Sequence, residues 1–371
     1  MGYVYATINK DTLAHICKEK GVSSEFLASK TKLNMSRLNQ WLTATDINLP
    51  TINQAKKIAA CLHIPFAGLY MNPCDIPLKR IPNIRNMRTM SGTVSIDDSS
   101  LNIAMIDVLL ERDFLLSADD EFGITPPDFE PLIPDSDSVD EWANAIRKQF
   151  AIDLGEQYKC SSTRQFYLYV RDKIETKGVF VHCFTDVTID TARGFSIYNT
   201  LLPIIGINDE DRPPAKTFTI IHELVHLFKR ESSLCNDMSS SASTLSEEVF
   251  CNAVAGELLV PKRALRIVLE HSHYFAPYSI DDIKRVADRF SVSREVIVRR
   301  LLELRKIDQS EYETYADLFR REIDRTSPSV SKILYQGYVN DVYSKLDIAR
   351  HLNVGQNHID KFLREVSKWN R

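Results

Sequence analysis

Apolar residues recur at helical spacing over most of the chain, and only a short central stretch has a β-like pattern. Residues 10–72 read as five short helices. Their apolar positions could form a small core of Leu13, Ile16, Phe26, Leu27, Leu33, Leu38, Trp41, Ile58 and Leu62. Helical patterning returns over residues 139–177 and again from Ser279 onward. Between these stretches lie three β-like runs, Val179–Phe184, Phe195–Tyr198 and Pro203–Ile207. The pattern predicts a mostly α fold with a small β-sheet, in the α+β class.

Capping residues mark several of the expected helix ends. Asn34 can cap the third helix, and Thr51 with Gln54 has the spacing of a capping box at the start of the fourth. Two longer helices are expected in the central part, Pro214–Lys229 and Ser246–Val260. The first begins at prolines, whose missing N–H costs little at a helix start.

Composition and patterning divide the chain into four parts. Residues 107–141 hold 12 acidic residues, one arginine and four prolines, so we expect a partly irregular connector there. The predicted organisation is a helical domain over 1–75, a connector over 76–145, a central domain over 146–278 and a helical C-terminal region over 279–371.

The net charge of −4 hides an asymmetry between the two ends of the chain. Residues 1–90 contain 12 Lys and Arg against 5 Asp and Glu, whereas the remainder contains 34 against 45. A basic N-terminal segment joined to an acidic remainder is typical of nucleic-acid-binding proteins. A basic surface could also bind an acidic protein partner. Seven cysteines without CxxC spacing fit a reducing cytosol. No signal peptide or membrane span is apparent, so a cytoplasmic protein is expected.

The central helix carries a metal-binding motif, His222-Glu223-Leu224-Val225-His226. Two histidines at i and i+4 lie on one helix face and can bind one Zn²⁺ together, with the glutamate beside the open coordination position. An apolar stripe on the same helix, Phe218, Ile221, Val225 and Phe228, gives it a face to bury. The sequence therefore predicts one zinc ion per chain.

Catalytic zinc usually takes three protein ligands, and Glu248 on the next helix is our candidate for the third. Asn252, one turn later, could hold a ligating histidine by its second ring nitrogen. Glu247 is the competing ligand, and Glu248 could instead only favour the helix dipole. In the predicted mechanism Glu223 is the general base that takes a proton from water. An oxyanion stabiliser stays open among His271, His273 and Tyr198.

Two linked stretches resemble the ImmA/IrrE family of zinc metallopeptidases. These are Phe218–Leu227, which holds the histidine motif, and Glu248–Pro261, which holds the third ligand and Asn252. Gly194–Tyr198 is similar to the same family. The resemblance implies a compact zincin-like domain, ligand roles for His222, His226 and Glu248, and the base role for Glu223. It also implies selective cleavage of a repressor or antitoxin protein, often in bacterial mobile elements or stress responses.

Residues 10–72 resemble the Cro/repressor (XRE)-type helix-turn-helix that often precedes this peptidase. Such a module inserts its third helix in the major groove. The side chains there that could read base edges are Ser36, Arg37, Asn39 and Gln40. The chain departs from the usual pattern after Trp41, where Leu42, Thr43 and Ala44 stand. The module could therefore bind DNA or contact a protein instead. Repressor-type modules often pair, so a homodimer is compatible with the sequence.

Two functions of different classes follow from these features. The first is a zinc endopeptidase (HExxH type) that cleaves one repressor or antitoxin and so regulates transcription. The second is a DNA-binding regulator or antitoxin whose zinc is structural or sensory. Glu223 favours the first, because a closed structural site needs no general base.

Overall fold

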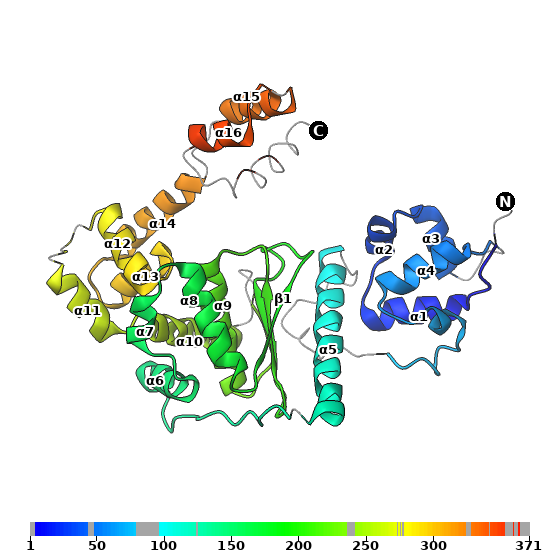
Figure 1. Cartoon of the computed structure of the whole chain (residues 1–371), viewed down its shortest axis with the longest axis horizontal. Helices are drawn as coiled ribbons and strands as arrows, with labels where there is room; N and C mark the ends of the chain where they lie inside the picture. The colour runs from blue at the N-terminus through cyan, green and yellow to red at the C-terminus, as the bar shows by residue number, and fades with distance from the viewer. Residues whose placement is uncertain are drawn as a thin grey trace. The chain divides into compact units, whose positions relative to one another are not determined.

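The structure is a computed structural model that describes most of the chain (Figure 1). The described residues are 4–43, 48–78, 96–123, 125–235, 242–272, 274, 276, 278–323, 328–340, 342–352, 359 and 363. The chain divides into two units, Met1–Ile297 and Val298–Arg371. The expected domain limits at 75, 145 and 278 are finer than this division and stay predictions.

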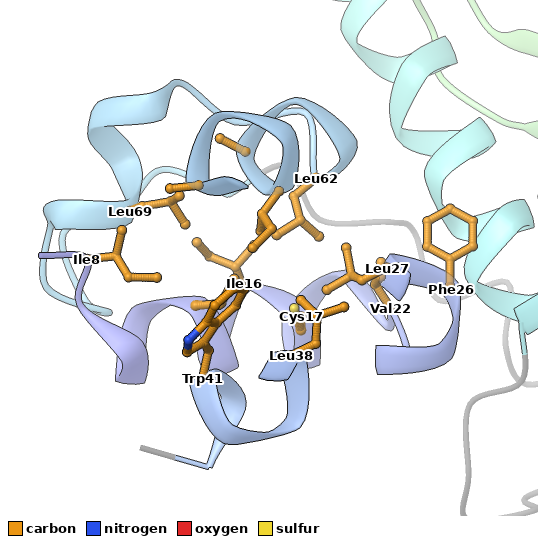
Figure 2. Close-up of a cluster of buried hydrophobic side chains, with 14 of the residues drawn as sticks. Ile8, Ile16, Cys17, Val22, Phe26, Leu27, Leu38, Trp41, Leu62 and Leu69 are labelled. Carbon is orange, nitrogen blue, oxygen red and sulfur yellow. The ribbon is translucent and has the colours of Figure 1, made fainter. Parts of the chain in front are cut away.

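The first unit begins with the five short helices that the sequence predicts. They are α1 (Lys10–Lys20), α2 (Ser24–Thr31), α3 (Met35–Leu42), α4 (Ile52–Cys61) and the 3-10 helix η1 (Phe66–Tyr70). Their buried side chains form one apolar cluster, with Ile16, Leu38 and Trp41 at its centre (Figure 2). Of the nine core positions expected from the pattern, eight are buried, and Leu33 is half-buried against the cluster.

Local capping explains where these helices begin. The Asn34 side chain accepts a hydrogen bond from the backbone N–H of Arg37, so α3 starts where the sequence places it. Thr51 and Gln54 exchange hydrogen bonds at the start of α4 and form the predicted capping box. Both interactions satisfy backbone groups that a helix end would otherwise leave unpaired.

Residues 107–141, predicted to be a partly irregular connector, are helical in their first part. A long helix, α5 (Ile96–Phe122), runs through the acidic stretch to residue 122. One face buries Leu101, Met105 and Val108 against the sheet described next. Neighbouring positions, Ile103 and Ile106, join the N-terminal cluster. Asp107, Glu111 and Asp113 fit this helix because they are half-buried or exposed and leave its apolar face free. Tertiary burial thus outweighs the acidic composition of this part of the segment.

A four-stranded mixed sheet forms the centre of the first unit. Its strands are β1 (Phe180–Phe184), β2 (Gly194–Ile197), β3 (Ile204–Asn208) and β4 (Ser233–Cys235), in the order β1-β3-β2-β4. β1 and β3 are parallel, whereas β2 is antiparallel to both β3 and β4. The first three strands match the β-like runs of the sequence. The prediction of a mostly α fold with a small sheet is confirmed.

Helices cover the two faces of this sheet (Figure 1). α5 packs on one face through its apolar side chains. The other face packs on α9 (Pro213–Phe228), which contacts both β2 and β3. α9 in turn contacts α8 (Thr163–Glu175) and α10 (Ala242–Leu259). The central helix is thus enclosed by the sheet and by helices.

The remaining helices are short. The first unit also holds α6 (Val139–Phe150), α7 (Leu154–Lys159), α11 (Lys262–His271) and α12 (Ile280–Phe290), and α13 (Arg294–Glu303) spans the division. The second unit holds α14 (Gln309–Ile323), α15 (Pro328–Val339) and α16 (Lys345–Leu352). It has a small apolar cluster of its own, in which Leu334, Ile348 and Ile359 are buried. In the described part of the chain, no helix is both long enough and apolar enough to cross a membrane.

Candidate metal centre

The metal-binding motif lies in the middle of α9. The helix starts at two prolines, and every residue from Thr219 to Phe228 is buried. His222 and His226 are one turn apart, so both imidazoles project from the same side of the helix. Their Nε2 atoms lie 3.3 Å apart. Burial on all sides fixes the orientation of both rings before any metal binds.

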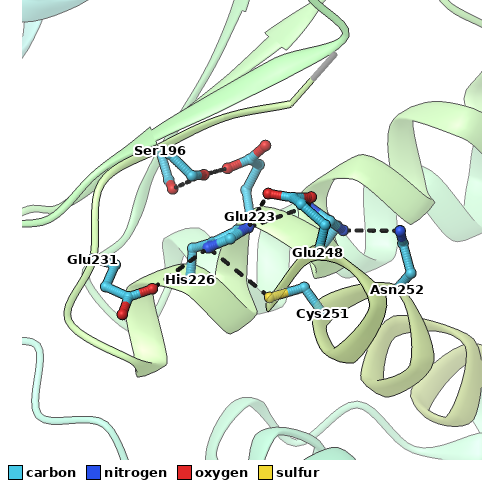
Figure 3. A network of polar contacts seen from close by, with 9 residues as sticks. Ser196, Glu223, His226, Glu231, Glu248, Cys251 and Asn252 are labelled. Atoms are coloured by element: carbon cyan, nitrogen blue, oxygen red, sulfur yellow. Dashed lines mark hydrogen bonds and ion pairs between the residues drawn. The ribbon is translucent and has the colours of Figure 1, made fainter. Parts of the chain in front are cut away.

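α10 brings a carboxylate to these imidazoles (Figure 3). Glu248 Oε2 lies 3.1 Å from Nε2 of His222, and Oε1 lies 3.4 Å from Nε2 of His226. The three side chains offer ligand atoms that are all within 4.8 Å of one another, so they could hold a metal ion. Glu247, the alternative in sequence, is not a member of this group among the described residues.

The other ring nitrogen of each histidine also has a neighbour. Asn252 Oδ1 lies 3.1 Å from Nδ1 of His222 (Figure 3). Asn252 follows Glu248 by one helical turn, so a single face of α10 presents both side chains. An amide oxygen at this distance favours the tautomer with a proton on Nδ1, which leaves Nε2 free for a metal.

His226 has two neighbours that the sequence analysis did not identify. Glu231 Oε2 and Cys251 Sγ each lie 3.9 Å from its Nδ1 (Figure 3). Glu231 reaches this position because α9 ends in a tight turn, in which Arg230 adopts a left-handed conformation with φ 61°. The backbone N–H of Glu231 then donates to the His226 carbonyl. The signal in the sequence was an acid five residues after a ligand, which is too common to single out.

The carboxylates strongly affect the protonation of the metal-free site. Burial lowers the pKa of His226, but hydrogen bonds to Cys251, Glu231 and Glu248 outweigh it and raise that pKa to about 12. For Glu248, burial raises the pKa, but hydrogen bonds from His222 and His226 outweigh it and hold the pKa well below its usual range. A proton on His226 therefore competes with a cation for this site.

Glu223 lies on the sheet side of the same helix and is fully buried. Its Oε2 accepts a hydrogen bond from the hydroxyl of Ser233 on β4. The other oxygen, Oε1, is buried and has no hydrogen-bond partner among the described residues. A buried carboxylate oxygen without a donor is costly, which is typical of a group that reacts with a molecule the free protein does not contain.

The structure does not select an oxyanion stabiliser among the three candidates from the sequence. Tyr198 follows β2, and its ring packs edge-on against Phe129 with the ring centroids 6.5 Å apart. His271 is exposed at the end of α11. His273 lies outside the described residues.

The side chains proposed to contact DNA lie on α3, away from the N-terminal core. Ser36, Arg37 and Asn39 are exposed, and Gln40 is half-buried. Leu38 and Trp41 on the opposite face are buried in the core. The helix is therefore amphipathic in the sense that a recognition helix requires. Ala44, where the sequence departs from the usual pattern, lies outside the described residues.

Comparison with known proteins bears on part of the chain. A search of curated proteins found no match. Among solved structures, a Mycobacterium tuberculosis transcriptional regulator is similar at 20% sequence identity, with a TM-score of 0.30. The similarity covers 44% of this chain and 46% of that protein, so the chain spans less than half the length of this relative. At this level the similarity carries no argument about function.

The family comparison is more informative because it covers the metal centre. Residues 175–302 match the Peptidase_M78 model, described as the IrrE N-terminal-like domain. The matched segment contains all four strands of the sheet, α9 and α10. It therefore holds the two histidines and Glu248, which converge on one point, and the buried Glu223. Residues 175–302 are therefore similar to the IrrE N-terminal-like peptidase domain, and this similarity, the motifs and the geometry together support a peptidase.

Proposed function

We propose that the chain is a zinc-dependent endopeptidase that cleaves a specific repressor or antitoxin protein and thereby regulates transcription. The observation that carries the proposal is the combination of one ligand group with one reactive side chain. His222, His226 and Glu248 form the ligand group. Glu223, which shares α9 with both histidines, has a buried carboxylate oxygen left free in the described part of the chain.

The donor set fits zinc in particular. Two imidazoles and one carboxylate are a common ligand set of catalytic zinc, which keeps a further position for water or substrate. A structural zinc site would be closed by four protein ligands, and only three are found among the described residues. The second function considered from the sequence, a regulator with structural zinc, is therefore less well supported.

The residues of the chain supply most of the proposed mechanism. Zinc, when bound, provides Lewis-acid chemistry: it makes water a better nucleophile and polarises the scissile carbonyl. Glu223 takes the proton from the attacking water on Oε1 and then delivers it to the leaving amine. Asn252 holds the His222 ring in the required tautomer. The buried surroundings strengthen these interactions by excluding bulk water.

The N-terminal helices would give the enzyme its location. We propose that α3 contacts DNA through Ser36, Arg37, Asn39 and Gln40, because polar side chains of these types read base edges or phosphates. A peptidase held near an operator would meet a DNA-bound repressor at high effective concentration. Contact with the helix-turn-helix of the repressor itself would serve the same purpose.

A substitution of Glu223 tests the peptidase proposal without knowledge of the substrate. The wild type and Glu223→Gln would be expressed in a bacterial host that carries the native genomic neighbourhood, and new protein N-termini would be compared by mass spectrometry. New termini in one or a few proteins are expected for the wild type and absent for Glu223→Gln, although both proteins hold zinc. Glu247→Gln is the matched control and should cleave normally. Equal cleavage by Glu223→Gln would disprove the mechanism.

A further inference from the structure

A chain of two serine hydroxyls leads to Glu223 from the sheet. The Ser196 and Ser233 hydroxyl oxygens are 2.9 Å apart, and Ser233 donates to Glu223 Oε2 (Figure 3). Glu223 and Ser196 have no exposed surface, and Ser233 is 1% exposed. Burial of two hydroxyls and a carboxyl group is unfavourable unless each is satisfied. The hydrogen bonds between these three side chains therefore offset the cost of burying them.

The fold brings these groups together by the alternation of side chains along β2. Phe195 and Ile197 face the α5 side and belong to the apolar cluster there. Gly194 and Ser196 consequently face α9. Gly194 lies so close to Thr219 that a Cβ atom at position 194 would come within 2.5 Å of the Thr219 methyl carbon. Glu223 lies one helical turn after Thr219, and Ser196 lies two residues after Gly194. The contact between Gly194 and Thr219 therefore brings Ser196 to the same region as Glu223.

The edge strand adds the second hydroxyl in register. Ser233 is paired directly with Ser196 across the antiparallel β2–β4 ladder. The next residue, Leu234, faces the opposite side and belongs to the apolar cluster under α5. Ser233 therefore points to the α9 face, and opposed hydroxyls on one sheet face are within hydrogen-bonding reach.

The hydrogen bonds can run in only one direction along this chain. A serine has one proton to donate, and an ionised carboxylate only accepts. Because Ser233 donates its proton to Glu223, Ser196 must donate to Ser233. Ser196 thereby fixes the rotation of the Ser233 hydroxyl, and Ser233 fixes one oxygen of Glu223.

We propose that Ser233, oriented by Ser196, is a positioning residue for Glu223. It holds Oε2 against the sheet so that Oε1, the oxygen without a partner among the described residues, is the one that takes a proton. This inference rests on the proposed function, because it assigns Ser233 a role in the step that Glu223 performs. The competing explanation is that the serines only satisfy a buried carboxylate and leave its reactivity unchanged.

Binding of acetohydroxamic acid to the cobalt-loaded protein separates these explanations. The compound binds a metal as its anion, so the proton of its N–OH group must pass to a base. In this site the only base that the proposal provides is Glu223. Cobalt(II) replaces zinc as a spectroscopic probe, and its visible absorption reports acetohydroxamate binding. No peptide substrate is required, and metal content is measured on the same samples.

Three serine variants supply the comparison. Ser233→Ala should bind cobalt as the wild type does but should weaken acetohydroxamate binding by about 10- to 100-fold, the usual effect of losing a partner that orients a reactive group. Ser196→Ala should weaken it less, because Ser233 keeps its own hydroxyl proton to donate to Glu223. Ser233→Thr restores the hydroxyl and should restore binding. Ser232→Ala is the matched control, because that exposed hydroxyl accepts from the Tyr198 N–H and does not reach Glu223.

Each alternative result has a defined meaning. If Ser233→Ala binds acetohydroxamate like the wild type while Glu223→Gln loses binding, the positioning role is wrong and the proposed function stands. If Ser233→Ala loses cobalt or unfolds at a much lower temperature, the serine is structural and the inference is again wrong. If the wild type takes up no cobalt, or Glu223→Gln binds acetohydroxamate like the wild type, the proposed function itself fails and the inference fails with it.

Discussion

The metal centre and the third helix of the N-terminal domain present their candidate functional side chains in opposite ways. His222, His226 and Glu223 are buried, and each contacts a partner from another element. Arg37 and Asn39 on α3 are exposed on an isolated face of a short helix. Buried groups on rigid elements are oriented before a ligand arrives, whereas exposed groups are ordered only on binding. The first arrangement suits catalysis, and the second suits contact with a large external partner.

The largest effect is expected from a substitution in the N-terminal hydrophobic core, which tests whether the two regions are independent. Trp41 is 2% exposed and lies in the N-terminal cluster. Trp41→Ala should destabilise that domain by about 3–5 kcal/mol, the usual cost of emptying a large aromatic site. Zinc content should not change, because none of the candidate ligands belongs to the N-terminal cluster. Urea unfolding and elemental analysis measure the two properties, and Arg37→Ala serves as the surface control. Loss of zinc in Trp41→Ala would show that the regions are coupled.

The pH dependence of zinc affinity tests whether His226 is protonated in the metal-free site. The raised pKa of His226 means that the metal-free site keeps a proton through neutral pH. Zinc must displace this proton, so affinity should rise with pH by about tenfold per unit below the raised pKa. Competition with a chromophoric chelator between pH 6 and pH 8, corrected for the chelator's own titration, measures the slope. A zinc affinity independent of pH would contradict the protonated state of His226.

A smaller effect on zinc affinity is expected from substitution of Asn252, whose side chain contacts His222. Asn252→Ala removes the acceptor beside Nδ1 of His222 and should weaken zinc binding by about 10- to 100-fold. Asn252→Asp keeps an acceptor oxygen and should retain most of the affinity. Equal zinc affinities for Asn252→Ala and the wild type would show that burial alone orients the ring.

On the exposed helix, the expected effect concerns DNA binding and not the metal site. Arg37→Ala should weaken binding to DNA from the chain's own upstream region and should reduce the salt dependence by about one counterion if Arg37 contacts a phosphate. If Arg37 instead reads a base, affinity for that DNA should fall by about 1–3 kcal/mol while affinity for random DNA hardly changes. Fluorescence anisotropy at several salt concentrations distinguishes the two. Identical salt curves for Arg37→Ala and the wild type on both DNAs would remove Arg37 from the interface.

Short-range features explain what could be predicted from the sequence. The spacing of His222 and His226 on one helix determines their common face, and capping at Asn34 and Thr51 sets helix starts through contacts three residues apart. Both depend on local geometry alone. The three longer strands of the sheet were visible because their β-like character extends over four or more residues.

Features that depend on tertiary packing were missed or misread. β4 has three residues, too few to show a pattern. The sequence analysis did not predict α5, because the acidic composition of residues 107–141 hid the apolar face that packs on the sheet. Ser196 and Ser233 are ordinary residues until strand pairing sets them opposite each other and against Glu223. Glu248 had been preferred over Glu247 from the sequence, whereas its distances to the two histidines follow from the packing of α10 on α9.

Zinc per chain tests the central claim most directly. Elemental analysis would compare the wild type with His226→Ala, Glu248→Ala and the control Glu247→Ala, each purified after growth with added zinc. About one zinc per chain is expected for the wild type and for Glu247→Ala, and far less for the two ligand variants. A wild type without zinc after this supply, or a Glu248→Ala variant that retains it fully, would contradict the three-ligand site.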